Sequence, residues 1–331
     1  MKHLLLLLIS IVYTLSSFAQ ITSSTIPETS IYYHAKKESF LSRTVKKAFV
    51  KAEQTAFLGN SISDLSTLNN ENAEIPKSVT KKVIIEEETF ENKTLWTFKP
   101  KDGTSDKVIF YTHGGGYIMG ILDMQWKLIS EIVQETNATV VIANYPCAYQ
   151  NTAKDTYAYL EKLYKKVLKE HSEKTMFFYG DSAGGGLAIA FAQYLNTVDL
   201  PQPSQIITLS PWLDVSLSNP DILRVESNDL ALEKSALQKV GQLYAGDIDV
   251  KDPRISPING DFKDIAKVTV FIGGAEIFIS DAQKLKHQLE TENIPFNYYE
   301  YPHMIHTWML VPIFKESKIA FRQMMDIINK G

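Results

Sequence analysis

Short apolar runs and amphipathic segments alternate along most of the chain. The apolar runs suit buried strands, whereas the segments between them carry apolar residues at helical spacing. Such alternation requires a mostly parallel, doubly wound sheet with helices on both faces, which is an α/β fold. The pattern predicts strands near 107–112, 139–144, 175–179, 205–209, 268–272 and 296–301, and helices near 123–136, 152–170, 183–196, 281–292 and 314–329.

The region before this alternation is organised differently. The runs 83–85 and 95–98 flank Glu91-Asn92-Lys93, which predicts a hairpin of two early strands. Residues 38–58 carry apolar positions among lysines, as in an amphipathic helix. Residues 20–35, rich in Ser and Thr, are expected to be a flexible terminus, and residues 59–79 are expected to be loop.

A long interval between Ser210 and Val268 interrupts the alternation of predicted strands and helices. It holds a polar stretch to Asp229 and then a helical run from Leu232 to Tyr244. We interpret residues 215–255 as a helical cap insertion within a catalytic domain of residues 80–331, and residues 20–79 as a second cap segment. The alternative for the 38–58 helix is a surface position on the back of the sheet.

The sequence Gly180-Asp181-Ser182-Ala183-Gly184 lies where a predicted strand meets a predicted helix. Gly-x-Ser-x-Gly at such a junction is the nucleophile-elbow pattern of α/β-hydrolases. The turn is so tight that side chains two positions before and after the serine would meet the neighbouring helix and strand. The pattern therefore predicts that Ser182 presents its Oγ at the carboxyl edge of the sheet.

A second motif, His113-Gly114-Gly115-Gly116, follows the apolar run 108–111. Glycines without Cβ atoms let the backbone approach a ligand and direct N–H groups at developing negative charge. We predict an oxyanion loop here, with Gly115 and Gly116 as the main donors beside Ala183, and Gly114 as a further candidate. Together the two motifs indicate a hydrolase.

At this point the chain resembles the hormone-sensitive-lipase-like esterases, also called bacterial family IV esterases, of the α/β-hydrolase superfamily. The likeness covers about residues 80–330 and includes residues 113–116, 180–185, 210–214 and 304–306. The resemblance implies an α/β-hydrolase fold with a helical cap and a serine esterase that needs no metal or other cofactor. One departure is the stretch 145–150, Tyr-Pro-Cys-Ala-Tyr-Gln, where family members usually have Tyr-Arg-Leu-Ala-Pro-Glu. It shapes the wall of the site.

In α/β-hydrolases the acid and then the histidine follow the serine along the chain. Two histidines, His303 and His306, lie in the loop after the last strand, and His306 is favoured because Met304-Ile305-His306 matches the family pattern. Glu276 directly follows the strand at 268–272 and is the favoured acid; glutamate is a variation that the family permits.

Asp281 competes with Glu276 for the acid's role. Ser280 and Gln283 predict a capping box that would place Asp281 in the first turn of a helix, where the helix dipole already accounts for a carboxylate.

The first nineteen residues have the pattern of a secretory signal peptide. Lys2 precedes an apolar core from Leu4 to Val12, and Ser17-Phe18-Ala19 provides small residues for cleavage before Gln20. The apolar run is short for a bilayer span of about 20 residues. We expect an exported protein, periplasmic or secreted, without a membrane span after cleavage.

The composition of the chain argues against two further features, a nucleic-acid partner and an intramolecular disulfide. The 331 residues carry a net charge of −4 without a basic cluster, which argues against a nucleic-acid partner. The single cysteine, Cys147, excludes an intramolecular disulfide and is expected to be a buried structural thiol.

The expected partner is a small ester, of short acyl or acetyl type, since two cap segments with aromatic residues such as Trp212 and Trp308 would enclose a small apolar pocket. A serine peptidase or other acyl hydrolase, and a non-catalytic binding protein on the same fold, are the alternatives. The oligomeric state stays open.

Overall fold

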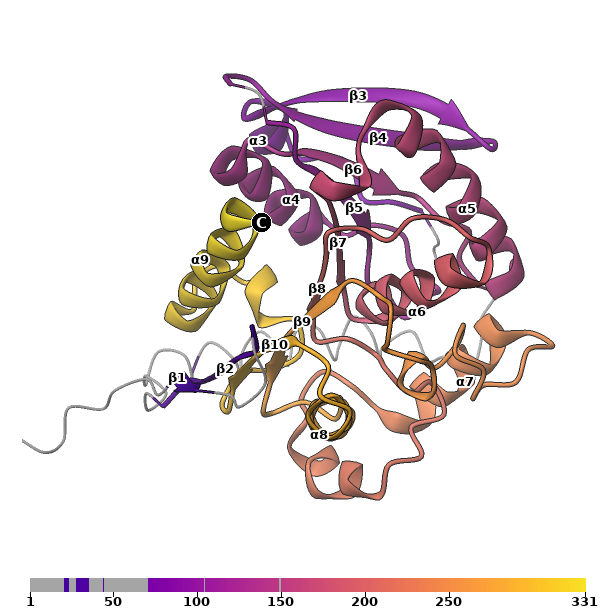
Figure 1. Ribbon diagram of the computed structural model, residues 1–331, viewed down its shortest axis with the longest axis vertical. Helices are drawn as coiled ribbons and strands as arrows, with labels where there is room; N and C mark the ends of the chain where they lie inside the picture. The colour runs from indigo at the N-terminus through magenta and orange to yellow at the C-terminus, as the bar shows by residue number, and fades with distance from the viewer. Residues whose placement is uncertain (1–20, 24–27, 36–43, 45–70, 104, 149) are drawn as a thin grey trace, which may run out of the picture.

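The computed structural model describes residues 21–23, 28–35, 44, 71–103, 105–148 and 150–331 (Figure 1). The predicted signal peptide and the predicted 38–58 helix lie outside these residues, apart from Thr44. The hairpin strands are β3 (Val83–Phe90) and β4 (Lys93–Pro100), preceded by the short helix α3 (Lys77–Thr80). The alternating part contains β5 (Val108–Thr112), α4 (Asp123–Thr136), β6 (Thr139–Ala143), α5 (Ala153–Glu170), β7 (Met176–Asp181), α6 (Ala183–Thr197), β8 (Gln205–Leu209), α7 (Lys234–Ala245), β9 (Lys267–Gly273), α8 (Ile279–Thr291), β10 (Phe296–Tyr301) and α9 (Lys315–Lys330).

The described strands form one sheet in the order β1-β2-β10-β9-β8-β7-β5-β6-β4-β3. From β2 through β10 to β6 each neighbouring pair is parallel, whereas β4 pairs antiparallel with both β6 and β3. The α/β-hydrolase fold with its mostly parallel sheet is therefore confirmed.

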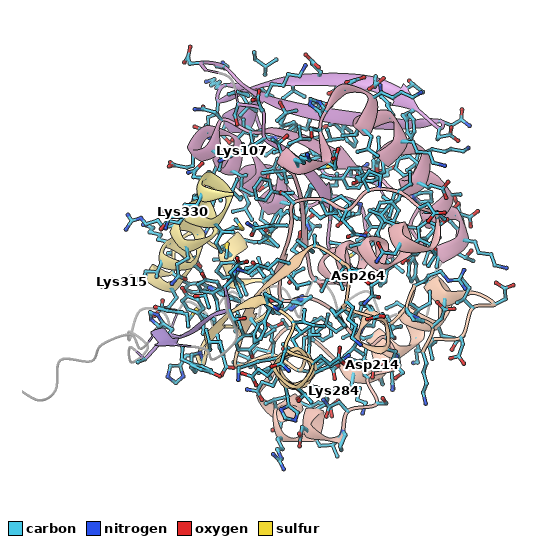
Figure 2. The ribbon with its side chains drawn as sticks, in the orientation of Figure 1. Lys107, Asp214, Asp264, Lys284, Lys315 and Lys330 are labelled. Atoms are coloured by element: carbon cyan, nitrogen blue, oxygen red, sulfur yellow. The ribbon has the colours of Figure 1, made fainter. Side chains whose placement is uncertain are left out.

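Helices cover both faces of the sheet (Figure 1). Residues along β5 alternate between two cores: Val108 and Phe110 join the core under α5, α6 and α8, while Ile109 and Tyr111 join the core under α4 and α9. Burial on both faces explains why the central strands are continuously apolar rather than alternating. Lys107 adds a contact to α9, since its Nζ donates to the carbonyl of Asn329 at 2.9 Å (Figure 2).

The structure of the N-terminal segment differs from the prediction of a flexible terminus. Residues 20–35 are not simply a flexible terminus, because β1 (Ile21–Ser23) and β2 (Ser30–Tyr33) form a hairpin at the sheet edge. β2 runs parallel to β10, with Ile31 opposite Tyr298. Its stability comes from this long-range pairing, which the local Ser- and Thr-rich composition does not reveal.

The strand order positions the site. From β5 the chain moves to β6 on one side, and then crosses back to β7 on the other side and continues to β8. Ligands of open α/β sheets bind at the carboxyl ends of the strands where the order reverses in this way. The glycine-rich loop follows β5 and the serine elbow follows β7, so both motifs lie at this switch point. Among the described residues, no helix is long and apolar enough to cross a membrane.

Candidate active site

The backbone at Ser182 is strained in the manner of a nucleophile elbow. Its φ of 54° and ψ of −125° lie in a region that non-glycine residues rarely adopt. The amide of Ser182 donates to the carbonyl of Leu209 at 2.8 Å, and its own carbonyl accepts from the amide of Trp212 at 3.0 Å. These bonds to β8 and the segment after it hold the turn in place.

The two glycines of the motif are required by close backbone contacts. A Cβ at Gly180 would lie 2.2 Å from the carbonyl oxygen of Gly184, and a Cβ at Gly184 would lie 2.1 Å from that of Thr112. The steric prediction for these positions is therefore confirmed, and the second contact shows that the elbow packs directly against the end of β5.

Three of the predicted side chains meet at this edge of the sheet. Nε2 of His306 lies 2.9 Å from Oγ of Ser182, and Nδ1 of His306 lies 2.6 Å from Oε2 of Glu276. The three residues follow β7, β10 and β9, whose carboxyl ends are brought together by parallel pairing.

Glu276 is fully buried, and two hydrogen bonds orient its carboxylate. Its Oε1 accepts from Oγ of Ser210 at 2.6 Å and from the amide of Gly273 at 2.9 Å. Ser210 in turn accepts from the amide of Thr307 at 3.0 Å, so it links the acid to the loop that carries His306. Ser210 belongs to the motif at residues 210–214, but nothing in that motif indicates this role.

The pKa of His306 is raised above its ordinary value of 6.5. Burial of the ring acts in the opposite direction, since it disfavours the charged imidazolium. The charge and hydrogen bond of Glu276, with the charges of Asp229 and Asp181, together outweigh the effect of burial. The site therefore favours a proton on this imidazole.

The alternative histidine and the alternative acid, His303 and Asp281, are not part of this triad. His303 is exposed on the loop before Met304 and is not part of the hydrogen-bonded chain to Ser182. Asp281 accepts instead from Nδ2 of Asn219 at 2.9 Å. The predicted capping box at Ser280 is wrong, because α8 begins at Ile279 and its N-cap is Phe278, which places Ser280 inside the first turn. Asp281 nevertheless lies in that turn, as expected.

The glycine-rich loop has an unusual backbone. Gly115 and Gly116 adopt φ values of 124° and 61°, and a third residue, Tyr117, adopts 64°. Among the described residues, no acceptor is present for the amides of Gly115, Gly116 or Ala183. Gly114 stays a further candidate donor, and its backbone also lies close enough to the carboxylate of Asp181 to lower the pKa of that group.

Asp181 ties the elbow to this loop. Its carboxylate is buried and accepts from Tyr111 and from Gln125. Burial raises the pKa of Asp181, while Tyr111, Gln125 and the backbone of Gly114 act against that increase. A Cβ at Gly114 would lie 2.4 Å from Oδ2 of Asp181, which explains why this position of the loop is glycine.

The segment that departs from the family pattern supports the loop from behind. The ring of Tyr145 stacks on His113 at 4.3 Å, and its hydroxyl donates to the carbonyl of His113 at 2.6 Å. The amide of Ala148 donates to the carbonyl of Tyr117 at 2.6 Å. Cys147 is a free, buried thiol, as predicted, and burial raises its pKa to about 12, which makes it a poor nucleophile.

Comparisons with known proteins assign the chain to a family. A family model described as alpha/beta hydrolase fold matches residues 109–310. The chain is 28% identical over 224 residues to a triacylglycerol lipase of Mycobacterium tuberculosis, covering 67% of this chain and 46% of the lipase. It is 25% identical over 203 residues to an acetyl-hydrolase of Streptomyces hygroscopicus, covering 61% of this chain and 68% of that enzyme.

Solved structures give the same picture over most of the chain. The crystal structure of a putative esterase from Staphylococcus aureus superposes with a TM-score of 0.75 at 25% identity and covers 87% of this chain and 93% of that one. An esterase from the bacterial hormone-sensitive lipase family superposes with a TM-score of 0.71 at 20% identity, covering 90% of this chain and 93% of that one; this likeness concerns the fold.

Proposed function

Because the chain belongs to the α/β-hydrolase fold family, and its motifs and relatives make it a hormone-sensitive-lipase-like serine esterase, we propose that it hydrolyses short-chain acyl or acetyl esters through an acyl-enzyme on Ser182. The observation that carries the proposal is the continuous hydrogen-bonded chain from Ser182 through His306 to Glu276.

The first half-reaction forms the acyl-enzyme. Oγ of Ser182 attacks the ester carbonyl while Nε2 of His306 takes its proton, and a tetrahedral intermediate results. Glu276 holds the imidazole with Nε2 facing the serine and stabilises the imidazolium, consistent with the raised pKa of His306. The imidazolium then gives its proton to the leaving alcohol as the C–O bond breaks.

The second half-reaction releases the acid. Water attacks the acyl carbonyl, His306 takes the proton from this water, and collapse of the new tetrahedral intermediate returns that proton to Ser182. No redox step and no external group transfer is involved.

The developing oxyanion is stabilised by backbone amides in this proposal. The amides of Gly115, Gly116 and Ala183 lie on the two loops that meet at the elbow, and they have no acceptor among the described residues. Loss of one such donor typically raises the barrier by about 3 to 4 kcal/mol, so these amides matter nearly as much as the triad.

The preference for short acyl groups is based on the surroundings of the loop. Helix α7 lies against it, since a Cβ at Gly116 would be 4.0 Å from Val240, and Trp212 lies between Tyr117 and Phe278. Trp308 is a less suitable wall than expected, because it is buried in the core against Tyr301. The relative named as an acetyl-hydrolase agrees with a small acyl pocket. We propose α7 as part of a cap, together with the 38–58 segment.

A chain-length series of nitrophenyl esters tests this function, with Ser182→Ala as the blank. Each methylene adds about 0.8 kcal/mol of apolar burial until the pocket is full, after which overpacking costs more. We expect the highest kcat/KM for acyl groups of about two to six carbons, and none for Ser182→Ala. Rates that continue to rise with long acyl chains would contradict the small pocket but not the esterase.

Export is a separate proposal that depends on the sequence alone. Lys2, the apolar core from Leu4 to Val12 and the small residues before Gln20 support removal of the first nineteen residues. N-terminal sequencing of the protein recovered from the producing cells tests it. A mature chain that begins at Gln20 is expected, and a chain that retains Met1 or Lys2 contradicts it.

A further inference from the structure

The helix of the insertion contacts the glycine-rich loop through one tightly stacked pair of aromatic rings. The ring of Tyr244 in α7 lies 3.8 Å from the ring of Tyr117, and the two planes differ by 4°. Both side chains are buried, at 0% and 1% exposure. Together with the approach of Val240 to Gly116, this stack places α7 directly on the loop.

Tyr117 needs support because its backbone is left-handed. Gly115 and Gly116 adopt positive φ at little cost, whereas a bulky residue at φ 64° is strained and persists only where its surroundings hold it there. Two contacts hold Tyr117 besides Tyr244. Its ring also packs on Trp212 at 5.7 Å, and its carbonyl accepts from the amide of Ala148 at 2.6 Å.

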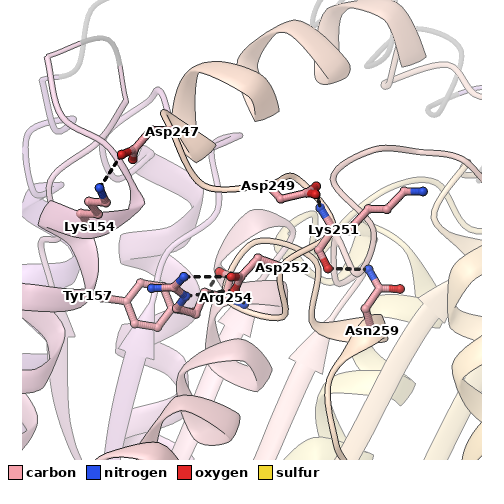
Figure 3. A network of polar contacts seen from close by, with 8 residues as sticks. All are labelled: Lys154, Tyr157, Asp247, Asp249, Lys251, Asp252, Arg254 and Asn259. Atoms are coloured by element: carbon pink, nitrogen blue, oxygen red, sulfur yellow. Dashed lines mark hydrogen bonds and ion pairs between the residues drawn. The ribbon is translucent and has the colours of Figure 1, made fainter.

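The end of α7 that carries Tyr244 is fixed to the body of the enzyme. Figure 3 shows the segment after the helix bound to α5: Asp247 pairs with Lys154 at 2.6 Å, and the hydroxyl of Tyr157 donates to the carbonyl of Arg254 at 2.9 Å. Gly246, at the end of α7, fits so closely against Thr152 that an added Cβ would lie 2.8 Å from its methyl group. Since the exposed ion pair contributes little, the buried Tyr157 and this close packing provide the anchor.

We propose that Tyr244 is a positioning residue for ester hydrolysis. By stacking on Tyr117 it holds that residue in its left-handed conformation, and it thereby keeps the amides of Gly115 and Gly116 directed at the oxyanion. The inference rests on the proposed esterase function. It assigns part of the catalytic rate to the insertion, which would otherwise only shape the substrate pocket.

The test distinguishes an effect of ring stacking on kcat from a general loss of stability. Tyr244→Leu removes the ring but keeps apolar bulk, and Tyr244→Phe keeps the ring. Tyr164→Leu is the matched control, because Tyr164 is equally buried but packs on Phe110, Phe178 and Phe191, away from the loop. For each variant, kcat and KM are measured with nitrophenyl butyrate, and melting temperature is measured alongside.

We expect Tyr244→Leu to lower kcat by on the order of 10- to 100-fold with little change in KM, because small misplacements of oxyanion donors are costly. Affinity for a trifluoromethyl ketone, which forms an oxyanion adduct on the serine, should fall by the same factor. Tyr244→Phe should stay within about twofold of the wild type, and Tyr164→Leu should lose stability but not kcat.

Tyr117→Leu removes the other ring of the same stack. This variant is used for the test if Tyr244→Leu does not fold. It should reproduce the loss in kcat, and the double variant should lose no more than either single one, since both remove one interaction. A kcat for Tyr244→Leu equal to that of Tyr164→Leu overturns the proposal, as does a rise in KM alone or full additivity. A wild-type protein without esterase activity overturns the proposed function itself, and that result is visible before any variant is compared.

Discussion

Ser210→Ala should impair catalysis although Ser210 touches neither the serine nor the predicted oxyanion. The hydroxyl donates to Oε1 of the buried Glu276 at 2.6 Å and accepts from the amide of Thr307 at 3.0 Å. Alanine removes both bonds without adding volume. Glu276 keeps its hydrogen bond from the amide of Gly273, but its carboxylate is less firmly oriented.

Two quantities can be worked out from these contacts. A hydrogen bond to a charged group contributes about 1.5 to 3 kcal/mol, and a partly buried amide left without an acceptor costs about 1 kcal/mol more, so the free energy of unfolding should fall by about 2.5 to 4 kcal/mol. If half of that loss also appears in stabilisation of the imidazolium, the barrier rises by about 1.2 to 2 kcal/mol, which corresponds to a roughly 8- to 30-fold lower kcat.

The assay compares steady-state kinetics and thermal unfolding of Ser210→Ala with those of Ser204→Ala. These two serines flank the same strand, β8, at opposite ends, and the hydroxyl of Ser204 donates to the carbonyl of Met176 at 2.8 Å, far from the triad. Ser210→Ala should lower kcat with KM unchanged, and Ser204→Ala should lower only stability. Equal kcat values for the two variants would refute the role given to Ser210.

Three further outcomes are expected. Glu276→Gln should lower kcat by orders of magnitude while Asp281→Asn stays active, and the reverse result in the same assay would exchange their roles. Because hydrolysis needs a neutral His306 and its pKa is raised, the acid limb of the kcat/KM profile should lie above pH 6.5, and a midpoint below 6.5 would contradict the influence of Glu276. Burial raises the pKa of Asp281 to about 6, so its charged form destabilises the fold as pH rises through 4 to 6; Asp281→Asn should gain about 3 kcal/mol over wild type at pH 7.5 and almost nothing at pH 3.5, as measured by urea unfolding.

Most of the central sheet could be predicted from the sequence because its strands are buried on both faces and therefore read as continuous apolar runs. The edge strand β2 could not, since its four residues gain their stability from pairing with β10, which lies about 265 residues later in the chain. Helix α8 begins at Ile279, two residues before the predicted start, because the chain enters the helix from the Glu276 turn and the polar side chain of Ser280 does not mark its beginning.

In the candidate site, too, local motifs could be predicted from the sequence, whereas contacts between distant segments could not. Ser182 and the glycine-rich loop carry short local motifs with steric causes, and these could be recognised directly. The support for Glu276 from Ser210, and the close approach of Asp181 to Gly114, depend on which loops meet at the sheet edge. The stack of Tyr244 on Tyr117 joins residues 127 positions apart, and no spacing in the sequence indicates it. The predicted segment at 38–58 lies outside the described residues and remains a prediction.

The central claim is that Ser182 forms the covalent intermediate. The most direct measurement is intact and peptide mass spectrometry of the protein after treatment with a fluorophosphonate, beside ester hydrolysis before and after treatment. One adduct per chain is expected, on the peptide that contains Ser182, with complete loss of activity, and Ser182→Ala should remain folded, unlabelled and inactive. Labelling at Cys147, or ester hydrolysis that survives in Ser182→Ala, would contradict the account.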